Sequence, residues 1–274
     1  MRRVLLLLLI IASLLYIFPI AHAFLNSFMS QAQINTTAIE LIPEQFNLQQ
    51  YYTLALYKGE YFKFFLNSLK LTSIIIAGQI GVGVFAAFAL AKMKFRGSRV
   101  LFVIYVLALL LPFQVTLVPN YLIFDASERL LHITILDTHL AILLPGIFSS
   151  FEVYLLRQFI RGIPDEIIEA ARMDGAGYGR ILFKIVFPMI KPAIFALAVL
   201  VFIDSWNMLE QAVIFLSSPE KLPLSVFLET IYYNDYSVFY AGAVLYIVPA
   251  LLILIKGEKY LRQGLSIGGL KNEK

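Results

Sequence analysis

The chain has 274 residues, of which 60% are hydrophobic and only 15% are charged. A soluble domain usually carries about a quarter charged residues, so this composition indicates a membrane protein. The sequence contains no cysteine, which excludes disulfides, thiolate metal sites and cysteine nucleophiles.

Six stretches are apolar over the roughly 20 residues that a helix needs to cross a bilayer. They are residues 4–24, 71–91, 100–124, 138–156, 192–209 and 237–255. The fourth is the weakest because it holds His139, Pro145 and Glu152, but the basic residues Arg157 and Arg161 follow it directly. The sequence therefore predicts an all-α membrane fold of six transmembrane helices, forming one transmembrane domain over residues 1–274.

The basic residues fix the orientation of these spans. With the amino terminus inside, the inside segments hold 17 of the 22 Lys and Arg residues, as the positive-inside rule expects. Both termini are then predicted to be cytoplasmic. The same asymmetry accounts for the net charge of +4 without a nucleic-acid partner. The outside segment 25–66 is long and rich in Gln, Asn and Tyr.

The first apolar stretch has a second interpretation. Arg2 and Arg3, a leucine run and then Ala21-His22-Ala23 resemble a signal peptide with its cleavage site. Cleavage would leave five spans and an outside amino terminus. We favour an uncleaved first helix, because the apolar stretch is longer than a usual signal core.

Small residues and prolines in the second and third spans predict local geometry. Gly78, Gly81 and Gly83 are predicted to allow close helix packing. Pro112 and Pro119 predict kinks in the third span.

The inside loop at residues 161–191 is more than a linker. Pro164 suits a first helical position, and Asp165 and Glu166 place negative charge near the positive end of the helix dipole. Ile168 belongs to an apolar face, and Gly175 can take the left-handed conformation that ends a helix. We expect a short helix, a glycine turn and a second helix over about residues 178–188. A plain amphipathic helix at the membrane surface would have the same pattern.

This loop reads Glu169-Ala170-Ala171, three residues, Gly175, nine residues, and then Ile185-Val186-Phe187-Pro188. The spacing resembles the EAA loop of binding-protein-dependent ABC importer permeases, with Phe187 where the family usually has Leu. Four further stretches are similar to the carbohydrate branch, and within it to the maltose-type second permease. They are Ile163-Pro164-Asp165-Glu166, Met173-Asp174-Gly175-Ala176, Trp206-Asn207 and the tail from Gln263 to Lys271. The resemblance covers about residues 67–271 and is most specific between 163 and 192.

The resemblance implies the partners and the division of labour. Such a permease works with a second permease subunit, two ATPase subunits and an extracytoplasmic solute-binding protein that delivers a sugar. By resemblance, the ATPase contact set is Glu169, Ala170, Ala171, Asp174 and Gly175. The sequence has no Gly-x-x-x-x-Gly-Lys-Ser/Thr phosphate loop, so ATP would be hydrolysed by the partner. This chain is then expected to be no enzyme and to hold no cofactor or metal.

Polar residues within or near spans are candidates for the substrate path. Asp204, Asn207 and Gln211 are spaced i, i+3 and i+7, which places them on one face of a continuous helix. Gln114 and Asn120 are further candidates in the third span, and Gln79 and Glu152 are polar residues of the same kind in the second and fourth spans. Polar contacts between helices, or with the partner permease, would use the same residue types.

Three other functions stay open at this point. One is an importer of another polar solute, such as a glycerophosphodiester or polyol. Another is a membrane-embedded enzyme with Glu152 or Asp204 as acid or base, although no nucleophile–base pair or metal motif supports it. The third is an ion-driven transporter, which would favour paired charges near mid-span.

Overall fold

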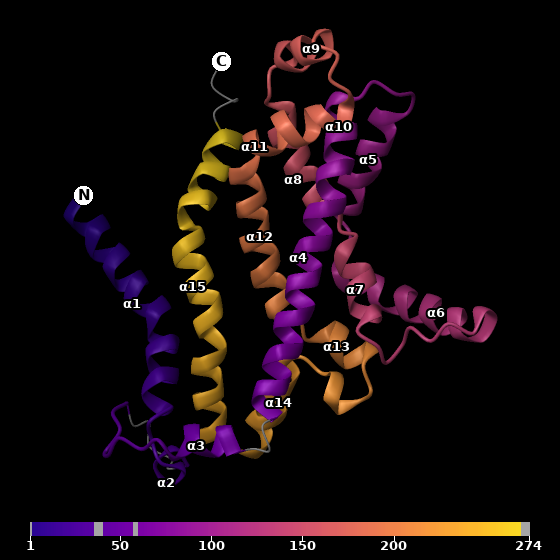
Figure 1. The fold of residues 1–274 in the computed structure, drawn as a ribbon. Helices are drawn as coiled ribbons and strands as arrows, with labels where there is room; N and C mark the ends of the chain where they lie inside the picture. The colour runs from indigo at the N-terminus through magenta and orange to yellow at the C-terminus, as the bar shows by residue number, and fades with distance from the viewer. Residues whose placement is uncertain (1, 36–40, 57–59, 270–274) are drawn as a thin grey trace. The chain divides into compact units, whose positions relative to one another are not determined.

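A computed structural model describes residues 2–35, 41–56 and 60–269, and every regular element within them is helical (Figure 1). The all-α prediction is confirmed. In chain order the elements are α1 (Arg2–Asn26), α2 (Gln31–Ile34), α3 (Gln49–Leu56), α4 (Glu60–Lys92), α5 (Ser98–Ala108), α6 (Phe113–Leu131), α7 (Leu140–Ile147), α8 (Ser150–Arg161), α9 (Asp165–Met173), α10 (Tyr178–Ile181), a π-helical segment (Leu182–Val186), α11 (Phe187–Met189), α12 (Lys191–Trp206), α13 (Glu210–Phe215), a 3₁₀ turn (Pro219–Lys221), α14 (Leu224–Asn234) and α15 (Tyr236–Gly269). Residues 270 and 271 of the tail motif lie outside the described residues.

Within the part of the chain that the structure describes, length and composition allow up to six membrane spans. Four stretches qualify alone, namely Arg3–Asn26, Glu60–Lys92, Leu140–Arg161 and Tyr236–Leu261. Two helix pairs qualify only together and are bent: α5 with α6 by 104°, and the Tyr178–Met189 stretch with α12 by 73°.

The third predicted span, residues 100–124, is not one continuous helix. α5 ends at Ala108, and α6 begins only after Pro112, whose ψ of 137° is extended. Proline has no N–H to donate and disfavours the helical conformation of the residue before it, so the chain turns sharply here. Pro119, in contrast, lies inside α6.

The fourth predicted span has an internal junction at Phe148 and Ser149. Ser149 caps α8: its Oγ accepts from Phe151 N at 3.3 Å, while Glu152 Oε1 accepts from Ser149 N at 3.1 Å. This reciprocal capping box satisfies two backbone donors that would otherwise be unpaired at a helix start. The second helix predicted in the inside loop is present as α10, the π-helical segment and α11.

The chain divides into two compact units, and each is described by itself. The first holds residues 1–67 and 222–251. Within it, Phe64 stacks on Phe227 at 4.4 Å between ring centroids, and the Tyr61 hydroxyl donates to Gly242 O at 3.3 Å. α4 and α15 contribute residues to both units. The single domain predicted from the sequence stays a prediction.

The second unit holds residues 68–221 and 252–274, and α4 packs closely there on α7 and α8. A β-carbon on Gly78 would lie 2.5 Å from Ile147 Cγ1, and one on Gly83 would lie 2.6 Å from Glu152 Cγ. The packing role predicted for these two glycines is confirmed. It is wrong for Gly81 within the described chain, where an added β-carbon would meet nothing within 4 Å.

Candidate functional site

The predicted loop helix is α9, and local sequence sets both of its ends. Pro164 precedes it with extended backbone, and two acidic residues occupy its first turn. At the other end Gly175 has φ +78°, its N–H donates to Arg172 O, and Ala176 N donates to Ala171 O, both at 3.0 Å. This is the Schellman arrangement, which requires a left-handed residue and therefore favours glycine.

The side chains that the resemblance assigned to ATPase contact lie at the surface of α9. Glu169, Ala170, Asp174 and Gly175 are exposed, and Ala171 is half-buried. Met173 is 88% exposed, whereas Ile168 on the opposite face is buried. Figure 1 shows α9 at one end of the second unit, beyond the adjacent ends of α4 and α8. A short helix with small residues and two exposed large apolar side chains, Ile167 and Met173, can accept another surface closely.

Two basic side chains connect α4 to α8 and to the start of α9. The Lys92 Nζ donates to Ile163 O at 2.6 Å and pairs with Asp165 at 2.5 Å, although only 3% of the Lys92 side chain is exposed. The hydrogen bond from Lys92, together with its charge, holds the pKa of the Asp165 carboxyl below its usual range. Arg157 Nε donates to Leu90 O at 3.2 Å. The first residue of α9 is thus bonded directly to the last residue of α4.

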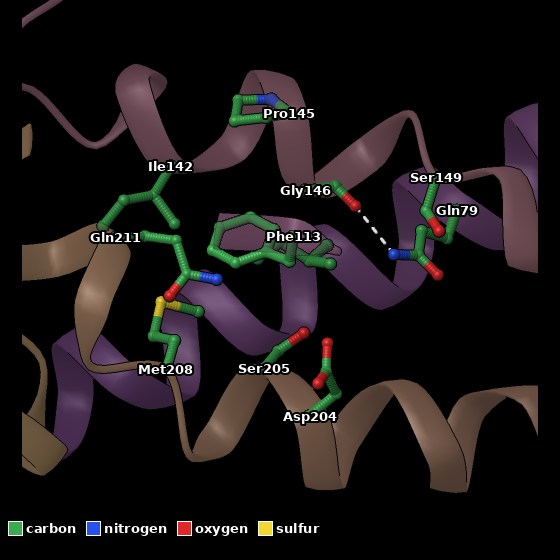
Figure 2. A pocket seen from close by; sticks show the side chains of 11 residues that line it. Gln79, Phe113, Ile142, Pro145, Gly146, Ser149, Asp204, Ser205, Met208 and Gln211 are labelled. Atoms are coloured by element: carbon green, nitrogen blue, oxygen red, sulfur yellow. Dashed lines mark hydrogen bonds between the residues drawn. The ribbon is translucent and has the colours of Figure 1, made fainter. Parts of the chain in front are cut away.

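A cavity of about 140 Å³ lies elsewhere in the second unit, bordered by α4, α6, α7, α12 and α13 (Figure 2). It is lined by Ile75, Gln79, Phe113, Ile142, Pro145, Gly146, Ser149, Asp204, Ser205, Met208 and Gln211. Pockets for small molecules usually measure roughly 300–1,000 Å³. The cavity is therefore too small to enclose an oligosaccharide by itself.

Two of the five predicted path residues line this cavity, namely Asp204 and Gln211. The prediction that these two residues share one helix face with Asn207 is wrong, because α12 ends at Trp206 and α13 begins at Glu210. Asn207 lies in the break, where its Nδ2 donates back to Ile203 O at 2.7 Å. The break itself directs Asp204 and Gln211 into the same space (Figure 2).

Gln114 and Asn120 do not line the cavity, because the break before α6 turns that helix away from the expected direction. Instead, Phe113 at the first position of α6 lines it. Gln79, one of the polar residues noted within the second span, lines the cavity as well, and its Nε2 donates to Gly146 O at 2.7 Å. Ser149 also lines it, and that residue was not predicted from the sequence. The Ser-x-x-Glu spacing at Ser149 is a helix-start signal that could have located this junction.

Glu152 does not line the cavity. Its side chain is 1% exposed, one carboxylate oxygen caps α8, and the other has no partner among the described residues. Helix capping explains why this carboxylate occurs in an apolar stretch.

A polar cluster joins the segment before α7 to the segment after α13. Asp137 accepts hydrogen bonds from Ser217 N and Ser218 N, both at 2.8 Å, and from the Ser218 hydroxyl and Lys221 Nζ. These hydrogen bonds, that from the Ser218 hydroxyl first, hold the pKa of the Asp137 carboxyl well below its usual range. His139 Nε2 lies 3.0 Å from Lys221 O and belongs to the same cluster.

The helical arrangement and the α9 loop can be compared with known proteins. A family model described as the binding-protein-dependent transport system inner membrane component matches residues 79–258. The chain belongs to this family. The family resemblance predicted from the loop motif is confirmed, and the permease is a multi-pass membrane protein of a transport family, not of an enzyme family.

Relatives cover most of the permease. It is 29% identical over 93% of its length to the arabinooligosaccharides transport system permease protein AraQ of Halalkalibacterium halodurans, covering 91% of that protein. It is 33% identical over 73% of its length to the sn-glycerol-3-phosphate transport system permease protein UgpE of Yersinia pestis, covering 70% of that protein. A solved bacterial ABC transporter for import of the acidic polysaccharide alginate contains a similar chain, with a TM-score of 0.82, 26% identity, and coverage of 94% of the permease and 95% of that chain.

Proposed function

We propose that this chain is one of two permease subunits of an ATP-driven importer that carries sugars or oligosaccharides delivered by an extracytoplasmic binding protein. The observation that carries the proposal is the exposed, Schellman-capped α9, formed by the family's loop motif. The relatives named for saccharides support the substrate class. Both termini of the permease are cytoplasmic in this proposal, as the distribution of basic residues predicts.

In this mechanism α9 is the coupling helix. Glu169, Ala170, Ala171, Asp174 and Gly175 contact a separate ATPase subunit, which binds and hydrolyses the ATP. The small residues allow close approach, and Glu169 offers a charge to a basic partner. Closure of the ATPase pair displaces α9 as a rigid body and shifts the permease between two access states.

The link between Lys92 and the start of α9 gives this displacement a route into the membrane. The buried ammonium holds both Ile163 O and Asp165, so movement of α9 acts on the end of α4. α4 also contributes Gln79 to the cavity. One continuous helix therefore joins the proposed coupling region to the proposed substrate path.

The substrate path in this proposal includes Asp204 and Gln211. Because the cavity of about 140 Å³ is too small to enclose an oligosaccharide, it forms one wall of the site and the second permease subunit supplies the facing wall. Importers of other polar solutes are the alternative within the family. They differ from the main proposal in the solute that stimulates transport, and not in the coupling helix.

The experiment is co-purification of the tagged permease with its neighbouring gene products in detergent, comparing wild type with Glu169→Lys. We expect an ATPase and a second permease to copurify with the wild type, and the ATPase to be lost from the variant. Glu229→Lys is the matched control, since it makes the same charge change at an exposed residue of α14. A wild type that purifies alone, while folded, contradicts the importer proposal. Retention of the ATPase by Glu169→Lys contradicts the coupling role.

A further inference from the structure

The cavity combines an apolar surface with a few polar groups from separate segments. Phe113, Pro145 and Met208 supply apolar surface, while Asp204 and Gln211 supply polar side chains. Figure 2 shows the Asp204 carboxylate and the Gln211 amide both pointing into the cavity. Such a mixture fits a ligand with both C–H and hydroxyl surfaces, since apolar walls give contact area and the polar groups set orientation.

The described lining of the cavity can carry negative charge but no positive charge. Among the described residues that line the cavity, Asp204 is the only one that ionises, and none is Lys, Arg or His. Asp204 is exposed rather than enclosed, so a solute in the cavity can reach its carboxylate. Carboxylate and phosphate groups of ligands are ordinarily bound by Arg and Lys, and this wall offers neither.

We propose that this wall of the path selects uncharged, polyhydroxylated saccharides and disfavours anionic ones, with Asp204 as the residue that binds hydroxyls and repels anions. The inference rests on the proposed function, because it takes the cavity to belong to the substrate path. It places the substrate with neutral saccharides, and apart from uronates and sugar phosphates.

The two oxygens of an ionised aspartate accept hydrogen bonds and donate none, so they suit the hydroxyl donors of a sugar. A uronate or phosphate in the same place puts two like charges within a few ångströms. At the effective dielectric of a protein surface, Coulomb repulsion at such distances changes a rate or affinity by about tenfold or more. Gln211 can serve either class, because its amide both donates and accepts. Asp204 therefore carries the discrimination.

The absence of native cysteine permits a direct test of the charge. In the assembled importer, Gln211→Cys is reacted with a cationic and an anionic methanethiosulfonate, and each rate is divided by that of a free thiol. We expect the cationic reagent to be favoured by about tenfold or more, and Asp204→Asn to remove most of this preference. Asp125→Asn, the same change at a residue of α6 that does not line the cavity, should leave it unchanged. Ser149→Cys is the second reporter if Gln211→Cys does not assemble.

Equal normalised rates, or a preference that survives Asp204→Asn, would overturn the charge assignment. Failure of both reagents to reach either reporter would overturn the cavity as part of a path. These outcomes need no transport measurement, so they are separate from the test of the proposed function.

Transport tests the selectivity itself. Proteoliposomes of the whole importer with its binding protein are given a neutral arabino-oligosaccharide, maltotriose or an oligogalacturonate of equal length, and uptake is followed. We expect uptake of a neutral saccharide and at least tenfold less of the acidic one. Equal or greater uptake of the uronate overturns the selectivity while leaving the saccharide importer standing. No uptake of any saccharide overturns the proposed function as well.

Discussion

Replacing Gly83 by Ala should destabilise the permease, whereas the same change at Gly81 should not. A β-carbon on Gly83 would lie 2.6 Å from Glu152 Cγ, 3.2 Å from its Cβ and 3.3 Å from Leu156 Cδ1. These atoms lie near the α8 backbone or in a buried side chain, so α4 and α8 must move apart. Overpacking of this kind costs about 1–3 kcal/mol. Gly81→Ala meets nothing within 4 Å and should gain about 0.5–1 kcal/mol, because glycine is a poor helix former.

The two variants should therefore differ by about 2 kcal/mol in free energy of unfolding, which corresponds to a difference of several degrees in Tm. Thermal unfolding of the purified importer in one detergent, with both variants measured side by side, gives this difference. Because the substitution is the same, effects of the residue on the unfolded chain largely cancel. Equal Tm values for the two variants would refute the close α4–α8 contact on which the argument rests.

The remaining predictions concern three local interactions. Lys92→Met should cost about 1.5–3 kcal/mol of stability, because it removes a charged donor from a buried carbonyl. Asp165→Asn should cost under about 1 kcal/mol, because its carboxyl is exposed. Similar Tm losses in both variants would contradict this ranking. Asp137→Asn should lower Tm at neutral pH, and the Tm difference from wild type should shrink as pH falls below about 4. A carboxyl whose pKa is lowered on folding stabilises the fold above its ordinary pKa and loses that contribution in acid. A Tm difference that does not change with pH would contradict this prediction. Gly175→Val should reduce ATPase co-purification, because a left-handed conformation costs about 1–2 kcal/mol for residues other than glycine. Gly177→Ala should not reduce it, because Gly177 has φ −72° and open space around it. Equal recovery of the ATPase with both variants would show that the turn is not required.

The elements with strong local signals could be predicted from sequence. Apolar length located the long helices α1, α4 and α15, and the proline, the acidic first turn and Gly175 together located α9 and its end. The lining of the cavity was only half predicted, because it depends on breaks in the helices. The chain between Trp206 and Glu210 leaves the helix inside an apolar context, and no residue there is a strong helix breaker.

Long-range contacts were the other limit. In the sequence Lys92 is one of several basic residues that follow a span, and nothing local distinguishes it from Lys94. Its role depends on the carbonyl of Ile163, which is 71 residues away. The glycines in α4 show the same limit, since Gly81 and Gly83 are two positions apart and only Gly83 is faced by another helix.

The thioether of Met173 gives α9 a chemical label of its own. Met173 is 88% exposed, so its sulfur is open to oxidants, and conversion to the sulfoxide makes the side chain polar. A protein surface seated on α9 would shield that sulfur, and its departure would uncover it. The extent of sulfoxide formation at this single position after a brief oxidant treatment, read by mass spectrometry, would therefore report the fraction of the permease whose α9 is uncovered.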